Sequence, residues 1–387
     1  MNSENNNKKK VLFLATVPSM IVSFNLRNIE MLKEMGYEIH AACNFHDHSA
    51  WTEEKLLEFQ NKLNEMSVVM HQINFPRKPW HPMLLLSSYF QIRKLLKREK
   101  FVLMHNQSCV SGIVGRIACH GIDIKILHTE HGFYYFKGGP WINWIFYPFD
   151  RICGCFTDAL FTINKEDYTF AQKFIKPKRV IYIPGIGVNT EFFHSTVIDR
   201  CAMRKYLGIP SDAFVVLSAG ELNKNKNHIV ILEAIKRIKY SNIYYVICGE
   251  GCERGNLMKR AEEMGMQDHF ILTGLVKNIN EYYKMADVFA FPSKREGLGL
   301  AAIEAMAAGL PLICSNKNGI NDYAEQGKTG YLCEPDDIDG FSDAITRFYE
   351  SKSLMESISK YNSNRAKLFD NRKSDDIMKK TYNLILE

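Results

Sequence analysis

Short apolar runs recur along the first half of the chain, separated by stretches with the apolar spacing of helices. The apolar positions in each run are continuous instead of alternating, which is typical of strands covered by helices on both faces. This half of the sequence therefore predicts a doubly wound parallel sheet. The runs begin at Val11, Glu38, Val68, Phe101, Lys125, Ala159 and Arg179.

The same rhythm restarts after the segment 183–193, which contains a proline and two glycines. We expect two Rossmann-like domains, residues 1–188 and 189–365, followed by a C-terminal helix at 366–387. Packing of this helix against the first domain is one of the arrangements that the sequence allows. Ligands of open α/β sheets bind beyond the carboxyl ends of the strands, so we expect the active site in a cleft between the domains. The second set of runs begins at Phe214, Ile243, Phe270, Val288, Leu310 and Gly330.

Composition narrows the class of protein. The chain has 387 residues, of which 46% are hydrophobic and 24% charged, as in ordinary soluble proteins of two domains. The formal charge of +6 is modest and its lysines are scattered, which does not indicate nucleic-acid binding. The ten cysteines are dispersed, and the pair Cys153 and Cys155 lacks further ligands for zinc, so we expect reduced thiols and a cytoplasmic protein. We expect no secretory signal and no membrane-spanning segment.

One strand, loop and helix carry candidate chemistry. The residues 288–293 predict a strand, 294–299 a turn, and 300–308 a helix that ends at Gly309. Helix-start N–H groups and the helix dipole attract an anion, and the glycines allow close approach to the main chain. The N–H groups are those of Gly297, Leu298, Gly299 and Leu300.

Two acids accompany that predicted anion site, Glu296 in the loop and Glu304 within the helix. Carboxylates accept hydrogen bonds from sugar hydroxyls, so a sugar nucleotide, with its phosphates between two hydroxylated rings, satisfies the whole pattern. The alternative is that both acids are solvated residues favoured by the helix dipole.

The segment 296–311 resembles the E-x7-E region of the retaining family 4 glycosyltransferases. These enzymes have the GT-B fold, in which two Rossmann-like domains face each other across a cleft. The segments 183–193, 220–228 and 246–265 are also similar to that family. The segment 128–168 is similar to its EpsD-like branch, which builds capsular polysaccharides or exopolysaccharides.

The resemblance implies roles for these residues. Glu304 holds the ribose hydroxyls, Glu296 contacts the transferred sugar, and the amides of 297–300 serve the sugar and the phosphates. Lys226 neutralises the departing diphosphate. Many relatives have arginine where this chain has Glu221, so Lys224 is a candidate replacement in donor binding. A solvated turn is the alternative for both lysines.

The resemblance also places His131 against the donor sugar, where a neutral imidazole exchanges hydrogen bonds with a hydroxyl. His128 is expected to be a packed strand residue. Neighbours in a strand point to opposite faces, so His128, Glu130 and His131 do not predict a metal site. Asn25 and Arg27 are left outside the core site, because an arginine on an amphipathic helix is more often at the surface.

The resemblance implies retaining transfer of a hexose or N-acetylhexosamine from a nucleotide-diphosphate sugar, expected to be a UDP-sugar, to an undecaprenyl-type lipid-linked saccharide, without cofactor or metal. The aromatic stretch Phe133–Phe149 and the basic run Gln91–Lys100 are then expected to rest on the inner face of the cell membrane. Core aromatics and a solvated helix face are the alternative.

Two other functions stay open, a sugar-nucleotide 2-epimerase and a catalytically silent sugar-nucleotide-binding protein. No G-x-G-x-x-G follows the first strand, which disfavours a dinucleotide oxidoreductase.

Overall fold

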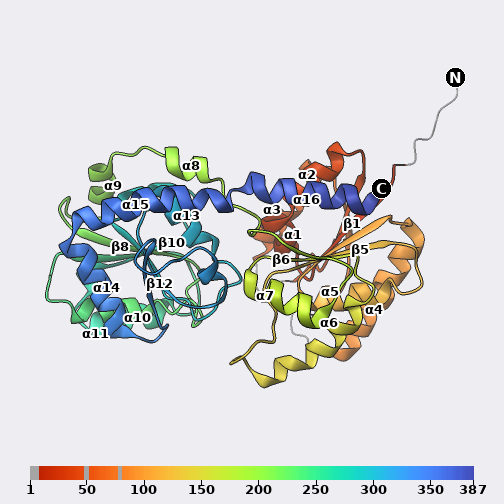
Figure 1. Ribbon diagram of the computed structural model, residues 1–387, viewed down its shortest axis with the longest axis horizontal. Coiled ribbons are helices and arrows are strands. Elements are labelled where there is room, and N and C mark those ends of the chain that lie inside the picture. Colours follow the sequence, from red (N-terminus) through yellow and green to blue (C-terminus); the bar gives the residue numbers. More distant parts are fainter. Residues whose placement is uncertain (1–7, 48–51, 77–80) are drawn as a thin grey trace. The chain divides into compact units, whose positions relative to one another are not determined.

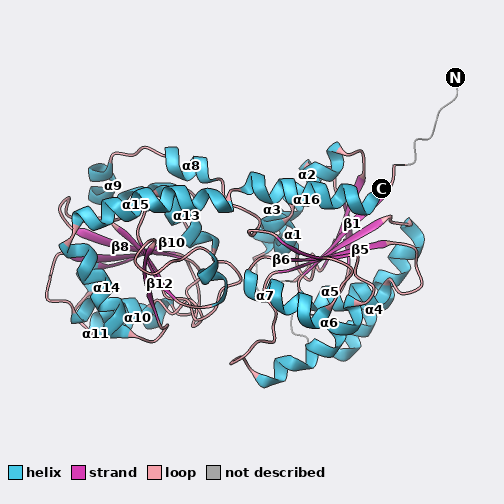
Figure 2. Ribbon diagram, in the orientation of Figure 1, coloured by secondary structure: helices cyan, strands magenta, loops and turns pink. Residues whose placement is uncertain are grey.

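The computed structural model describes residues 8–47, 52–76 and 81–387; the first seven residues of the polar N-terminal stretch lie outside these ranges. The chain divides into two compact units, shown in Figure 1 and Figure 2. The first unit comprises Met1–Ile186 and Asp375–Glu387, and the second comprises Gly187–Ser374.

The first unit is built on a parallel sheet with the strand order β3-β2-β1-β4-β5-β6-β7. Each of the seven strands predicted for this half of the sequence is present, and the central ones are buried along almost their whole length. The strands are β1 (Lys10–Leu14), β2 (Glu38–Cys43), β3 (Val69–Gln72), β4 (Leu103–Gln107), β5 (Lys125–Glu130), β6 (Ala159–Thr162) and β7 (Val180–Tyr182).

Helices connect these strands, as parallel pairing requires. Helices α4 and α5 pack together, and α5 also contacts α6. The elements are α1 (Pro18–Phe24), α2 (Leu26–Glu34), α3 (Glu53–Glu65), α4 (Pro82–Glu99), α5 (Cys109–Ala118), η1 (Trp141–Phe146), α6 (Tyr147–Gly154), α7 (Lys165–Phe170) and η2 (Ala171–Ile175).

The second unit has a parallel sheet with the order β10-β9-β8-β11-β12-β13, and its six predicted strands are likewise present. The strand order reverses direction between β8 and β11, which pair through Val288 with Val216 and Phe289 with Leu217. The strands are β8 (Phe214–Ala219), β9 (Ile243–Cys248), β10 (Phe270–Gly274), β11 (Val288–Phe291), β12 (Leu312–Ser315) and β13 (Gly330–Cys333).

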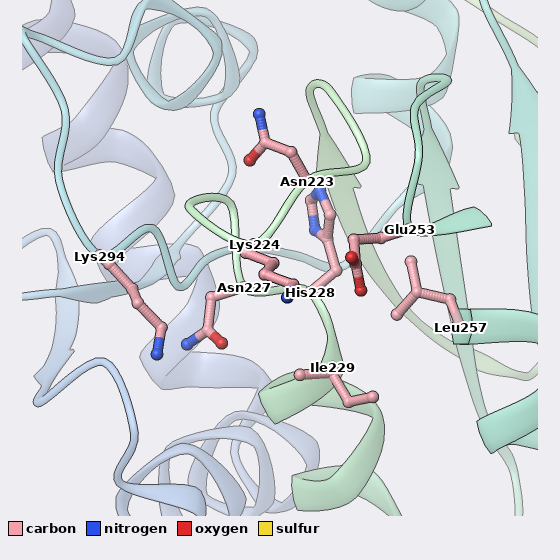
Figure 3. Close-up of a pocket in the computed structure, with 8 residues that line it drawn as sticks. All are labelled: Asn223, Lys224, Asn227, His228, Ile229, Glu253, Leu257 and Lys294. Carbon is pink, nitrogen blue, oxygen red and sulfur yellow. The ribbon is translucent and has the colours of Figure 1, made fainter. Parts of the chain in front are cut away.

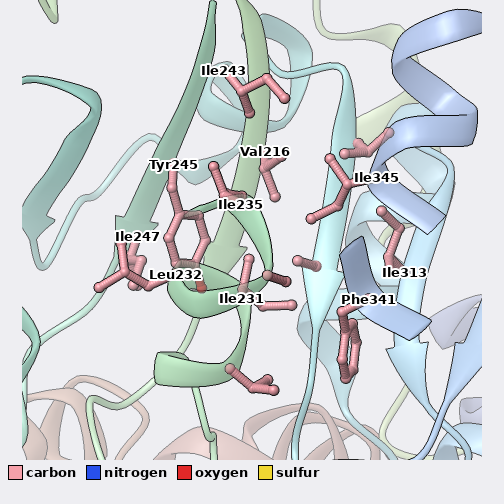
Figure 4. Packing of buried hydrophobic residues seen from close by; sticks show 14 of the residues in the cluster. Val216, Ile231, Leu232, Ile235, Ile243, Tyr245, Ile247, Ile313, Phe341 and Ile345 are labelled. Atoms are coloured by element: carbon pink, nitrogen blue, oxygen red, sulfur yellow. The ribbon is translucent and has the colours of Figure 1, made fainter. Parts of the chain in front are cut away.

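Figure 4 shows one core of this unit, where Ile231 and Ile235 of α10 and Phe341 and Ile345 of α14 pack with Tyr245 of the sheet. Helix α13 instead contacts α8 and α15. The elements are α8 (Thr190–Ser195), α9 (Arg200–Tyr206), α10 (Ile229–Arg237), α11 (Arg254–Glu263), η3 (Gln267–His269), α12 (Ile279–Met285), α13 (Leu300–Ala308), η4 (Asn318–Asp322), α14 (Ile338–Glu350), α15 (Lys352–Ala366), η5 (Lys367–Phe369) and α16 (Asn371–Leu386).

The last residues of α16 belong to the first unit. The hydroxyl of Tyr382 lies 2.8 Å from Nδ1 of His105, and Nε2 of His105 lies 2.8 Å from Oγ1 of Thr129. All three side chains are buried, so a continuous hydrogen-bonded chain joins the C-terminal helix to strands β4 and β5. Arg27 pairs with Asp375, which agrees with the surface role expected for this arginine.

The ten cysteines are free thiols, as the sequence predicts. Across the described residues, none of the helices combines the length and the apolar character that a bilayer crossing needs.

Candidate functional site

The predicted donor residues lie on two loops that leave neighbouring strands. The loop 220–228 follows β8 and the loop 292–299 follows β11, so both begin at the point where the strand order reverses. Such switch points are the usual ligand sites of open parallel sheets. Hydrogen bonds join the loops, among them one from the Lys294 amide to the Asn225 carbonyl at 2.8 Å and one from the Asn225 side chain to the Arg295 carbonyl at 2.8 Å.

Lys226 and Glu296 meet between these loops, where Nζ of Lys226 lies 2.6 Å from Oε1 of Glu296. The side chains are only 20% and 11% exposed, so the pair is largely shielded from water. The Lys226 ammonium also lies 5.1 Å from the centre of the Phe291 ring, within the range of a cation–π contact. The structure therefore fixes the predicted cation beside one of the two predicted acids.

Helix α13 begins and ends as predicted, at Leu300 and before Gly309. Gly299 precedes the helix with φ of 87°, and a Cβ there would lie 2.7 Å from the Phe291 ring. Glycine is therefore required at this position by both backbone conformation and space. Within the described part of the chain, the N–H groups of Leu298, Gly299 and Leu300 donate to no protein acceptor.

The loop before α13 is held from behind by Gly319, whose amide donates to the Glu296 carbonyl at 3.2 Å. A Cβ on Gly319 would lie 2.1 Å from the carbonyl oxygen of Gly297, so the two loop segments are in direct contact. This support fixes the backbone next to the three N–H groups that lack an acceptor.

Glu304 lies in the second turn of α13, where it accepts a hydrogen bond of 2.9 Å from the hydroxyl of Tyr283. Burial raises the pKa of the Glu304 carboxyl, and the Tyr283 hydrogen bond opposes part of that rise. Tyr283 is fully buried in α12 and was not singled out from the sequence. One carboxylate oxygen of Glu304 thus has a fixed donor, which orients the group.

Lys224 lines a pocket of about 230 Å³ with Lys294 and His228, shown in Figure 3, and neither Lys226 nor Glu296 lines that pocket. The two lysines that the sequence grouped together thus have different surroundings.

His131 belongs to the first unit and follows β5. Its Nε2 lies 2.9 Å from Oε1 of Gln107, and the Gln107 amide donates to Asn25 at 3.1 Å. Burial lowers the pKa of His131 to about 4, so the ring is neutral at pH 7. Gln107 was missed from the sequence, although its place at the carboxyl end of β4 was the available signal.

His128 is a packed residue of β5, as expected, and lies 3.3 Å from the buried Glu130. Residues two apart in a strand share a face, so the opposite-face argument fails for this pair. Among the described residues, no group of three His, Cys, Asp or Glu side chains is arranged to hold a metal. A buried ion pair between Arg116 and Asp150 was also missed, because it joins residues 34 apart in sequence.

Comparison with known proteins identifies the family. A model described as Glycosyltransferase Family 4 matches residues 24–192, and one described as Glycosyl transferases group 1 matches residues 199–365. The chain is 31% identical to the glycosyltransferase EpsD of Bacillus subtilis (strain 168), over 98% of this chain and 97% of the relative. The chain belongs to the family 4 glycosyltransferases. This glycosyltransferase is thus a member of the family that its E-x7-E segment resembles.

The glycosyltransferase is also 32% identical to the Escherichia coli UDP-Gal:alpha-D-GlcNAc-diphosphoundecaprenol alpha-1,3-galactosyltransferase, over 70% of this chain and 72% of the relative. Among solved structures, Anabaena HepE in complex with UDP has a TM-score of 0.80 at 17% identity, covering 97% of this chain and all of HepE (100%). WaaG has a TM-score of 0.73 at 16% identity, covering 95% of this chain and 99% of WaaG. The fold is GT-B, as predicted.

Proposed function

We propose that this glycosyltransferase moves a hexose or N-acetylhexosamine from a UDP-sugar to a lipid-linked saccharide, with retention of the anomeric configuration. The Lys226–Glu296 pair carries the proposal, because it places one cation and one hydroxyl acceptor at the switch point of the second sheet. Support for uridine as the base comes from the UDP complex of HepE and the UDP-Gal donor in the name of the E. coli relative.

The donor site consists of Lys226, the amides of 297–300, Glu296 and Glu304. As the sugar–phosphate bond breaks, negative charge grows on the diphosphate, and the Lys226 ammonium and the helix-start amides stabilise it. Diphosphate oxygens compete with Glu296 for the ammonium, which frees the carboxylate to accept a sugar hydroxyl. Glu304, oriented by Tyr283, accepts from the ribose.

His131, from the first unit, accepts a hydrogen bond from a hydroxyl of the transferred sugar. Its Nε2–H donates to Oε1 of Gln107, so Nδ1 of the neutral ring is left as the acceptor. Two relatives have undecaprenol diphosphate saccharides in their names, the E. coli galactosyltransferase and a Campylobacter jejuni N-acetylgalactosaminyltransferase. A lipid-linked saccharide is the acceptor class that these names support.

We also propose that the segment 141–152 of the first unit rests on the membrane that holds this acceptor. Trp141 is 81% exposed, and further large apolar side chains in the segment are exposed. Asp150, its acidic residue, is buried against Arg116 and Tyr135, so the exposed charge of the segment is the positive charge of Arg151. The exposed apolar residues are Trp141, Ile142, Trp144, Ile145, Phe149 and Ile152.

Product analysis tests the transfer. The purified enzyme is incubated with a panel of nucleotide-diphosphate sugars and a synthetic undecaprenyl-type diphosphate-linked N-acetylglucosamine, and the lipid product is identified by mass spectrometry. An added sugar with equimolar release of UDP supports the transfer, and the anomeric coupling constant of the product tests retention. Epimerised nucleotide sugar without lipid product would instead support the 2-epimerase, and UDP binding without turnover across the panel would support the silent binding protein.

A further inference from the structure

The pocket beside Lys224 has the features of a second ligand site in this unit. It has a volume of about 230 Å³ and is drawn in Figure 3. Its wall includes the start of helix α10 at Ile229 and the N-cap of helix α11, Glu253, so two helix N-termini open onto it. The partial positive charge of helix N-termini favours an anion here.

Two lysines supply further positive charge. Lys224 has no hydrogen-bond or ion-pair partner among the described residues, and it is exposed. Lys294 approaches from the other loop and lies 2.8 Å from Asp336, but both side chains are exposed, at 47% and 76%. An exposed ion pair of this kind is weak, so Lys294 is available to a competing anion.

His228 forms a buried part of the pocket wall and carries a second, independent signal. The residue is 3% exposed, and its Nε2 has no hydrogen-bond partner among the described residues. Its Nδ1 lies 3.4 Å from the hydroxyl of Tyr245, which lies 3.0 Å from Oγ of Ser218. A buried polar atom without a partner costs free energy unless a ligand or water completes it.

The hydrogen-bond chain assigns the role of that free atom. The Ser218 hydroxyl donates to the Ala290 carbonyl at 2.7 Å, so its oxygen accepts from Tyr245, whose oxygen in turn accepts from Nδ1–H of His228. Nε2 of this tautomer is an acceptor. Burial and the nearby Lys226 lower the pKa of His228 to about 3, with the Glu221 backbone opposing part of the shift, so the ring stays neutral at pH 7.

We propose that this pocket binds a phosphorylated sugar or polyol, at a site separate from that of the nucleotide-sugar donor. Lys224, Lys294 and the two helix N-termini hold the phosphate, while His228 Nε2 and the Glu253 carboxylate accept hydrogen bonds from hydroxyls. A role as hydroxyl acceptor explains why the Glu253 carboxylate lies in a pocket whose other charged groups, Lys224 and Lys294, are positive. Because Lys224 and Lys226 share one loop, an occupant of this pocket also orders the loop that holds the donor phosphates.

Calorimetric titration of the full-length protein tests this site without requiring transferase activity. Glucose 1-phosphate is the probe, with inorganic phosphate and glucose as separate arms that distinguish the contributions of anion and hydroxyls. We expect glucose 1-phosphate to bind more tightly than either arm, and saturating UDP not to displace it. If inorganic phosphate bound as tightly as glucose 1-phosphate, the proposal that His228 and Glu253 accept hydrogen bonds from hydroxyl groups would be wrong. If UDP displaced glucose 1-phosphate, the pocket would be part of the donor site and the proposal of a separate site would be wrong.

Variants locate the binding. Lys224→Gln and Glu253→Gln are each expected to weaken glucose 1-phosphate roughly tenfold, the size of one lost charged hydrogen bond, while UDP affinity stays unchanged. Lys236→Gln is the matched control, since this exposed lysine lies at the other end of α10. Absence of binding to the wild type, or an effect of Lys226→Gln in place of Lys224→Gln, would overturn the proposal. These outcomes concern this pocket alone and leave the proposed transfer reaction to its own test.

Discussion

The Lys226 ammonium lies 2.6 Å from the Glu296 carboxylate, although the two residues are 70 positions apart in the sequence. The pair exists because β8 and β11 are neighbours and their loops leave the same edge of the sheet. The ring of Phe291, the last residue of β11, makes a cation–π contact with the ammonium. A residue assigned to the leaving group and one assigned to the sugar are thus held in place by the same strand pair.

Substitution of Lys226 separates stability from catalysis. Lys226→Met leaves the Glu296 carboxylate largely buried without its partner, so we expect the free energy of unfolding to fall by about 1–3 kcal/mol. We expect kcat/KM to fall roughly 100-fold or more, the usual effect of losing a group that stabilises transition-state charge. Urea unfolding and steady-state kinetics measure the two effects.

The double variant Lys226→Met/Glu296→Gln is the control for this separation. It removes the unpaired carboxylate, so we expect part of the lost stability to return and the activity to stay low. Recovery of activity in the double variant would mean that Lys226 acts only through Glu296.

Gly299 tests the strained loop before α13. Gly299→Ala forces a side chain into a left-handed backbone conformation and against the Phe291 ring, so we expect a loss of about 1–3 kcal/mol in unfolding free energy and weaker UDP binding. Gly327→Ala is the matched control, because Gly327 also has positive φ, at 74°, but no atom near its Cβ position. Equal stability losses in the two variants would show that contact with Phe291 contributes nothing.

Tyr283→Phe tests the orientation of Glu304. Loss of the hydroxyl removes the hydrogen bond that opposes the burial effect, so the pKa of Glu304 rises further. A carboxyl whose pKa is raised by folding favours the folded state at low pH, and that contribution is lost as pH rises through the folded pKa. With its higher pKa, Glu304 of the variant becomes protonated at a higher pH than in the wild type, and a protonated carboxyl is a weaker acceptor for the ribose hydroxyls. As the pH is lowered, we therefore expect the UDP affinity of the variant to begin to fall at a higher pH than that of the wild type. Titration calorimetry from pH 5 to 8 measures this difference. Identical pH profiles would show that this hydroxyl does not tune Glu304.

His131 should titrate near pH 4. Because the folded pKa is below the unfolded value of 6.5, the folded state binds fewer protons between these values. The stability contribution of the neutral ring is therefore full above pH 6.5 and declines as pH falls toward 4. NMR titration of the labelled ring measures this pKa directly, with His131→Gln assigning the resonance. An apparent pKa near 6.5 would contradict the burial that lowers the pKa of this ring.

Vesicle flotation tests the membrane contact. With vesicles containing anionic phosphatidylglycerol, we expect the wild type to float, since burying exposed Trp141 and Ile145 removes apolar surface from water and Arg151 meets anionic headgroups. Trp141→Glu/Ile145→Glu should remain in the soluble fraction, whereas Val197→Glu should float, because Val197 is 92% exposed in the second unit. A wild type that stays soluble would rule out this contact.

The strands and the start of α13 could be predicted because their signals are local. Continuous apolar runs mark the buried strands, and Gly309 marks the end of a helix that begins after Gly299. The contacts within the site could not be predicted, because they join distant segments. Tyr283 meets Glu304 across 21 residues, and Gln107 meets His131 across 24.

The separation of Lys224 from Lys226 was also hidden from the sequence, which shows only two lysines two residues apart in one loop. The side that each side chain faces depends on the backbone of the loop, where Asn227 has a positive φ of 56°. The pattern of apolar residues does not predict such a conformation, because an irregular loop has no repeating apolar pattern.

The central claim is that Lys226 and the loop before α13 bind a nucleoside diphosphate through its phosphates. Calorimetric titration of UDP and of uridine into the wild type and Lys226→Gln measures the phosphate contribution that this lysine makes. The account predicts that UDP binds the wild type at least about tenfold more tightly than uridine does, and that Lys226→Gln removes most of this difference while uridine binding is unchanged. Equal UDP affinity in the wild type and in a folded Lys226→Gln variant would contradict it.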